Sequence, residues 1–94
     1  MALAKHMVEK RLAACANVFP AGRSFFFWEG KVQDAEETIM ILKTRKSLWN
    51  SVRAAIEAGH PYEVPCITAI DMADGNNAFL AWLEQETQSA VSSP

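Results

Sequence analysis

The sequence lacks the features that mark several large functional classes. Its 94 residues carry a formal net charge of −2 and no long block of Lys or Arg, so the electrostatic pattern of a nucleic-acid-binding protein is absent. No apolar run approaches the roughly 20 residues that a membrane-spanning helix needs. We therefore expect partners other than nucleic acid or a membrane.

Cysteine is scarce as well. The chain has two, Cys15 and Cys66, which are far apart and are not preceded by the apolar segment of a secretory signal. Such a pair is more typical of reduced thiols than of a disulfide framework. These observations predict a cytoplasmic protein.

Catalytic motifs are also missing. The sequence contains no glycine-rich phosphate loop, no nucleophile elbow and no Cys-x-x-Cys pair. A thiol of Cys15 activated by the imidazole of His60 is an alternative, but nothing in the sequence places the two together and no third orienting group is evident. We predict that the protein is not an enzyme.

The pattern of apolar and polar residues predicts one α+β domain over residues 1–88, followed by a short Ser/Pro tail over 89–94. Ser47 is expected to cap the middle helix, and Gly59 to end it. A polar stretch at 34–36 is expected to separate the two strands of a long antiparallel hairpin. The predicted helices cover residues 2–13, 47–58 and 77–88, and the predicted strands cover 14–19, 24–33, 37–44 and 63–71.

The segment from His60 to Cys66 concentrates polar chemistry. It places an imidazole, a phenol, a carboxylate and a thiol within seven residues. Pro61 and Pro65 favour extended backbone at the residues before them. Imidazole, carboxylate and thiolate are metal ligands, and a Cys/His pair favours copper or zinc over magnesium or calcium. The segment is therefore a candidate metal site.

Four blocks of sequence occur in a characteristic order and spacing: residues 11–17 (RLAACAN), 28–31 (WEGK), 43–45 (KTR) and 60–65 (HPYEVP). In this order and spacing they resemble the CutA divalent-cation tolerance proteins. The resemblance extends from about residue 2 to residue 83. It implies a ferredoxin-like, PII-like sandwich with an antiparallel sheet and helices on one face, assembled as a homotrimer. It also implies a role in tolerance of copper and other divalent metals.

The resemblance also implies a cleft between subunits. The residues at the matching motif positions are Cys15, Lys43, His60, Tyr62 and Glu63. We expect Cys15, His60 and Glu63 to bind a metal ion, copper or another divalent cation, with no obligatory cofactor. Lys43, Tyr62 and Cys66 are further candidates for the cleft. The alternative function is a PII-like small-molecule or signalling module.

Each candidate has a structural interpretation as well. Cys15 lies among alanines, and a free cysteine often packs as a small core residue. His60 is as well suited to a structural hydrogen bond, and Tyr62 and Glu63 to an interface network. Lys43 follows an apolar strand and needs a partner, such as an anionic ligand or Glu63 of a neighbouring subunit.

The sequence departs from the family pattern in two places. The family has a strand and loop before the first helix, and the apparent loss of this interior strand should expose backbone groups of two neighbours and leave an apolar trough. A chain extended upstream of Met1 is expected to supply the strand and to melt at a higher temperature. The second departure is Cys66, where the family pattern normally has glutamate. Sulfur there favours Cu(I) or Zn(II).

The aromatic run from Phe25 to Trp28 should send side chains to both faces of one strand. One face is expected to enter the core of the protomer, and the other needs a different cover. We predict that the long hairpins of three protomers pair and bury it. Trp28, Trp49 and Trp82 are expected to be core or interface anchors.

Overall fold

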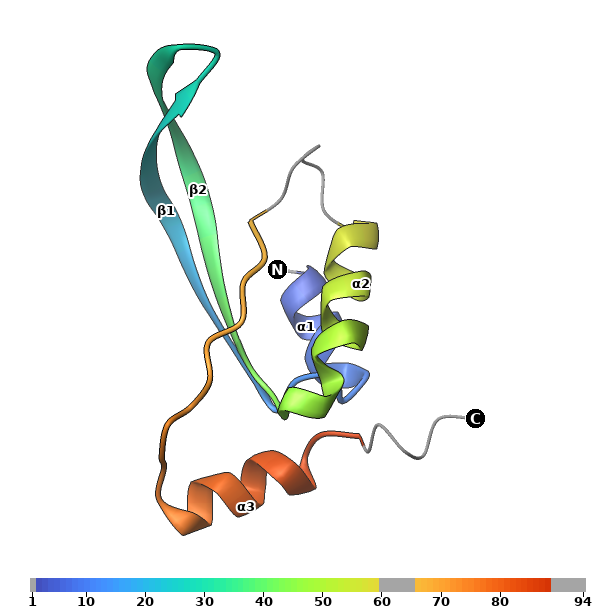
Figure 1. Ribbon diagram of the computed structural model, residues 1–94. Coiled ribbons are helices and arrows are strands. Elements are labelled where there is room, and N and C mark those ends of the chain that lie inside the picture. Colours follow the sequence, from blue (N-terminus) through green and yellow to red (C-terminus); the bar gives the residue numbers. More distant parts are fainter. Residues whose placement is uncertain (1, 60–65, 89–94) are drawn as a thin grey trace.

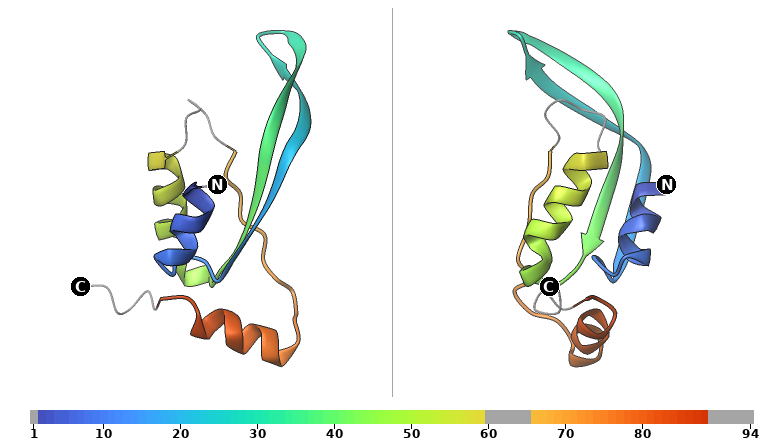
Figure 2. Two further views of the ribbon diagram at one scale, coloured as in Figure 1. Left: turned by 180° about the vertical axis from the view of Figure 1, so that it is seen from behind. Right: turned by 90° about the vertical axis from the view of Figure 1, so that its right-hand side faces the viewer.

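The computed structural model describes residues 2–59 and 66–88. An antiparallel hairpin carries two helices on one face of its lower half, and a third helix crosses its base (Figures 1 and 2). The predicted α+β class, with an antiparallel sheet and helices on one face, is confirmed. The elements are α1 (Ala2–Glu9), β1 (Cys15–Trp28), β2 (Lys31–Lys43), the 3-10 turn η1 (Lys46–Leu48), α2 (Trp49–Gly59) and α3 (Asn77–Gln85).

Helix α1 ends four residues before the predicted boundary at residue 13. Arg11 adopts a left-handed conformation, with φ of 58°. The amide of Leu12 donates to the carbonyl of Met7 at 3.0 Å, and the amide of Arg11 donates to that of Val8 at 3.0 Å. These two bonds form a Schellman motif, which ends a helix and usually has glycine at the left-handed position. Because this position is Arg11 and not glycine, no residue pattern in the sequence marked the end of the helix.

The hairpin turns at Glu29 and Gly30, and the predicted turn at 34–36 is wrong. Trp28 pairs with Lys31, so two residues connect the strands. Both have positive φ, 52° and 77°, as a type I′ turn requires. The polar residues at 34–36 lie within β2, where Arg23 donates to Asp34 across the sheet at 3.1 Å.

Strand β1 continues past Pro20 and Gly22, where the sequence predicted a stop. The register shifts between Phe19 and Gly22, so a bulge absorbs the irregular residues. Ala21 takes the left-handed conformation there, with φ of 60°. Proline is compatible with a strand at a bulge, where its missing donor costs no ladder bond.

The core lies between the helices and the lower half of the hairpin. Leu48, Val52 and Ile56 lie on one face of η1 and α2 and are buried against Met7. Ser47 does not cap α2, because it lies inside η1, whose N-cap position is Arg45. The predicted helix end at Gly59 is confirmed.

Residues 66–76 form an extended segment that belongs to no strand. The predicted strand over 63–71 is therefore wrong for residues 66–71, and residues 63–65 lie outside the described part. A strand requires a neighbour that shares a ladder of hydrogen bonds. The segment runs alongside β2 with a gap between them and then enters α3 (Figures 1 and 2).

The upper half of the hairpin projects away from the helices (Figure 1). Phe25 and Phe27 are 72% and 77% exposed on one face, and Phe26 and Trp28 are 39% and 50% exposed on the other. The prediction that one face of this aromatic run enters the protomer core is wrong. The core ends below the bulge, so within the described protomer neither face is covered.

Candidate functional site

Cys15 and Lys43 lie side by side at the base of the hairpin. Their Cα atoms are register partners in the ladder between β1 and β2. Cys15 is half-buried, and its thiol lies 3.8 Å from the Oδ1 atom of Asn17, a weak hydrogen bond. The half-buried position is compatible with both interpretations of Cys15, as a packed thiol and as a metal ligand.

Lys43 has a partner within the protomer. Its Nζ atom lies 5.9 Å from the centroid of the Phe79 ring, within the range of a cation–π contact. Phe79 belongs to α3, so the contact joins the hairpin base to the last helix. The negative face of the Phe79 ring attracts the ammonium group of Lys43, as the predicted anionic partner would, but more weakly.

The next two residues of the Lys-Thr-Arg block fix the surrounding elements. The hydroxyl of Thr44 donates to the carbonyl of Leu12 at 2.6 Å. The guanidinium of Arg45 donates to the hydroxyl of Thr87 at 2.9 Å and also bonds the carbonyls of Glu84 and Thr87. These bonds satisfy free carbonyls at the end of α3. The block therefore joins the α1–β1 loop, the hairpin and α3.

Cys66 is exposed and lies on the extended segment. It lines one wall of a groove of about 1440 Å³, and Lys43 lines another. The structure therefore brings these two predicted cleft residues to one groove, and Cys15 is not among its lining residues. His60, Tyr62 and Glu63 lie outside the described residues.

Among residues 2–59 and 66–88, no three His, Cys, Asp or Glu side chains gather closely enough to bind a metal ion. Cys15 is the described member of the predicted set of three ligands. A complete site would need donors from the 60–65 segment or from a neighbouring subunit.

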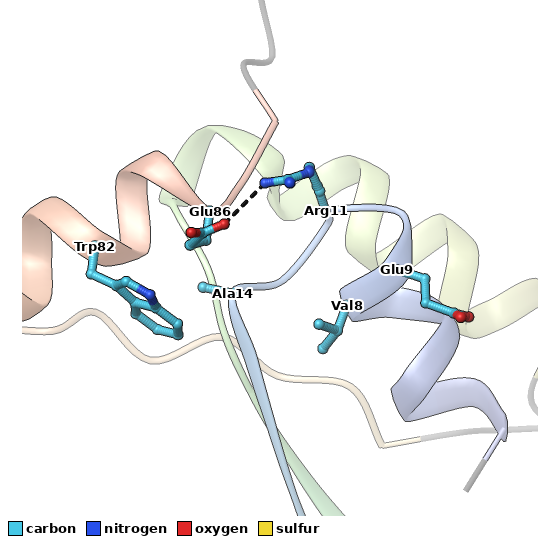
Figure 3. Close-up of a pocket in the computed structure, with 6 residues that line it drawn as sticks. All are labelled: Val8, Glu9, Arg11, Ala14, Trp82 and Glu86. Atoms are coloured by element: carbon cyan, nitrogen blue, oxygen red, sulfur yellow. Dashed lines mark hydrogen bonds and ion pairs between the residues drawn. The ribbon is translucent and has the colours of Figure 1, made fainter.

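A second, smaller cavity of about 380 Å³ lies between the end of α1 and α3 (Figure 3). Arg11 crosses it and bonds Glu86 at 3.0 Å, while Glu9, Ala14 and Trp82 also line it. No sequence pattern indicates this cavity, because Arg11 and Glu86, which meet there, are 75 positions apart in the chain. The positive φ of Arg11, at the end of α1, has no sequence signal.

The described part of the chain contains no helix with both the length and the apolar character needed to cross a membrane. Residues 1–86 match the family described as CutA1 divalent ion tolerance protein.

Individual relatives cover nearly the whole chain. The divalent-cation tolerance protein CutA of Archaeoglobus fulgidus is 45% identical over 92% of this chain and 83% of its own length. The corresponding protein of Pyrococcus horikoshii is 44% identical over 89% of this chain and 81% of its own length.

Solved structures agree with these sequence matches. The structure of CutA1 from Oryza sativa superposes with a TM-score of 0.89 at 39% identity, and the match covers 93% of this chain and 80% of that one. The Archaeoglobus structure, described as that of a periplasmic divalent cation tolerance protein, gives a TM-score of 0.88 at 45% identity, covering 93% of this chain and 84% of that one. The chain belongs to the CutA1 family of divalent ion tolerance proteins.

Proposed function

We propose that this protein binds divalent cations, copper foremost, in a metal-tolerance role and without catalysing a reaction. The observation that carries the proposal is the family match over residues 1–86, together with relatives named for divalent-cation tolerance. Here the metal is the cargo of the protein, and no resident cofactor is invoked.

The proposed ligands are Cys15, His60 and Glu63. Among the described residues the proposal is supported by Cys15, a half-buried thiol that pairs with Lys43 at the base of the hairpin. A thiolate favours copper and zinc over magnesium. Since no complete ligand set occurs within the described residues, we propose that the set is completed across a subunit boundary. Lys43, Tyr62 and Cys66 are proposed as further residues of the cleft between subunits, although within one protomer Lys43 and Cys66 line a groove that Cys15 does not line.

The proposed assembly is a homotrimer. The exposed aromatic run on the upper hairpin supports an assembly, since Phe25 and Phe27 are 72% and 77% exposed. Exposed apolar patches of this kind mark interaction surfaces. The number three rests on the resemblance to the family, and light scattering at micromolar concentration tests it. A stable monomer would contradict it.

Calorimetry with copper, zinc and magnesium tests the metal site. We expect copper to bind more tightly than magnesium, and each of Cys15→Ser and His60→Ala to weaken copper binding by roughly ten-fold or more. The two losses should not add, because the ligands share one ion. Cys66→Ser is the matched thiol control, with a smaller effect. Copper affinity that is unchanged in both ligand variants would reject the site.

A thermal-shift screen separates this function from the PII-like alternative. Stabilisation by metals but not by nucleotides supports metal binding, since a ligand raises stability according to its affinity for the folded state. Stabilisation by a nucleotide alone would favour a signalling module. The same comparison should be made with the Cys15→Ser variant.

We place this function in the cytoplasm. Two free thiols, one of them exposed at Cys66, are easier to maintain in a reducing compartment. The Archaeoglobus structure is described as periplasmic, so the compartment needs its own test. Cell fractionation with a periplasmic and a cytoplasmic marker provides it, and recovery with the periplasmic marker would contradict the assignment.

A further inference from the structure

The smaller cavity, between the end of α1 and α3, is separate from the residues of the predicted metal site that the structure describes. Its volume of about 380 Å³ lies at the lower end of the range for small-molecule sites. Cys15, Lys43 and Cys66 do not line it. Its lining comes from the end of α1, the loop that follows α1, and the end of α3. A ligand can therefore bind here independently of a metal ion at Cys15.

Two partly exposed apolar side chains lie on opposite sides of this cavity. Figure 3 shows the indole of Trp82 on one side and the side chain of Val8 on the other, with Ala14 between them. Trp82 is 42% exposed and Val8 is 37% exposed, whereas Ala14 is buried. A small apolar group placed here covers surface of both exposed side chains, and the burial of such surface is favourable.

The charges around the cavity favour a cation. Glu9 and Glu86 carry two negative charges and Arg11 carries one positive charge, so the lining has a net charge of −1. Helices α1 and α3 both end beside the cavity, at Glu9 and Gln85, and the C-terminal end of a helix dipole is negative. The same groups repel an anionic ligand.

The ion pair between Arg11 and Glu86 leaves the carboxylate able to bind a second cation. The Nη1 atom of Arg11 lies 3.0 Å from the Oε2 atom of Glu86. A carboxylate has two oxygen atoms with about four acceptor sites, so Glu86 can bond Arg11 and a ligand at once. The pair is exposed to solvent, and an exposed ion pair is weak enough to rearrange at little cost.

The lining suits an organic cation better than a metal ion. Within residues 2–59 and 66–88, no three His, Cys, Asp or Glu side chains lie close enough together to bind a metal ion. An ammonium group needs fewer protein ligands, because it can lie over an aromatic ring as well as beside a carboxylate. Tryptophan is the most favourable aromatic side chain for this contact, and Trp82 lines the same cavity as Glu86.

We propose that this cavity binds a small organic cation, an ammonium group carried on a short alkyl body. The ammonium group lies between the ring of Trp82 and the carboxylate of Glu86, and the alkyl body packs against Val8 and Ala14. Arg11 competes with the ligand for Glu86 and thereby lowers the affinity.

NMR spectroscopy at the indole N–H group of Trp82 tests the proposal. The full 94-residue chain, isotopically labelled, is titrated with n-butylammonium chloride at constant ionic strength. The signal of Trp82 is identified by its loss in the Trp82→Leu variant. We expect a saturable shift of this signal at millimolar ligand concentration. Sodium butyrate has a similar alkyl body with the opposite charge, and n-butanol has no charge, so neither should produce a saturable shift.

Two variants of the ion pair test the sign of the charge effect. Glu86→Gln removes the carboxylate and should weaken n-butylammonium binding by about three-fold or more. Arg11→Met removes the competing cation and should strengthen binding by about three-fold. Arg53→Met is the matched control, because it removes an arginine from an exposed ion pair on α2 and should leave the affinity unchanged. Circular dichroism checks that each variant is folded.

Three results would overturn the proposal. The first is the absence of a saturable shift with n-butylammonium in the unsubstituted chain. The second is an equal shift with butyrate or n-butanol, which would mean that the charge of the ligand is not recognised. The third is weaker binding to the Arg11→Met variant, which would mean that Arg11 attracts the ligand and does not compete with it.

Discussion

The lower and upper halves of the hairpin share one sheet but differ in what covers them. Below the bulge, Cys15 and Val18 on β1 and Met40 and Leu42 on β2 are half-buried against or beside the helical core. Above it, Phe27 is 77% exposed although it is more apolar than several of these residues. The two halves have similar strand propensity, so propensity alone does not explain burial.

The two halves of the hairpin are therefore stabilised at different levels of organisation. The lower half is stabilised within the protomer, by packing on α1 and α2. The upper half has no such cover in the described protomer. Its apolar side chains contribute to stability only when another chain buries them. Substitutions in the two halves should therefore change different measurements.

The largest expected effect lies in the core below the bulge. Met7 is fully buried at 0% exposure, so Met7→Ala should lower the free energy of unfolding by about 2–5 kcal/mol through lost burial and a residual cavity. Urea denaturation at fixed protomer concentration measures it. Lys5→Ala, at an exposed position of the same helix, should change it by less than about 0.5 kcal/mol. Equal effects would mean that the core is elsewhere.

In the upper half, Phe27→Asp should act on assembly. Burying an aromatic side chain contributes about 1.5–3 kcal/mol, and an unpaired carboxylate in its place opposes burial. We expect the mass in light scattering to fall from the assembly to the protomer while the helical circular dichroism persists. Ala54→Asp adds the same charge at an exposed position of α2 and should leave the mass unchanged. An unchanged mass for the Phe27 variant would show that the upper half is not an interface.

At the base of the hairpin, Arg45→Met should release the end of α3. It removes the hydrogen bonds to Thr87 and Glu84 while keeping the length of the side chain. The expected loss is about 1–3 kcal/mol, with faster hydrogen exchange in α3. Arg53→Met is the control, since its exposed pair with Glu57 should contribute about 0.3–0.5 kcal/mol. Unchanged exchange in α3 would contradict the role of Arg45.

The smallest effect is expected at the hairpin tip. Gly30 has φ of 77°, and a Cβ added there meets no atom within 4 Å. Gly30→Ala should therefore cost about 1 kcal/mol through backbone conformation alone. Thermal unfolding measures the loss, and Gly30→Asn, which tolerates the left-handed region, should recover part of it. A much larger loss from alanine would mean that the tip has contacts in the assembly.

Much of the fold follows from residue patterns of short range. The apolar face of α2 is set by the spacing of Leu48, Val52 and Ile56, and all three are buried. The antiparallel hairpin follows from two long apolar stretches. The turn was misplaced because a polar stretch within β2 resembled a loop, whereas Glu29-Gly30 carried the left-handed conformations that a two-residue turn needs.

The candidate site was predictable only in part. The sequence identified Cys15 and Lys43 individually, and the register of the hairpin makes them neighbours. It did not reveal that Arg45 fixes α3, because that contact joins residues 42 positions apart. The expected apolar trough has a counterpart in the groove beside β2, whereas the segment that forms its far wall was wrongly predicted to be a strand over 66–71.

The order of the helices and the hairpin and the buried face of α2 follow from the sequence alone, since they depend on periodicities of 3.6 and 2 residues within each element. The end of α1, the pairing of Arg11 with Glu86, the exposure of the upper hairpin and the groove between β2 and residues 66–73 depend on the tertiary structure. These features depend on groups brought together from distant parts of the chain. No local pattern encodes such a contact, because its free energy exists only after the elements have packed.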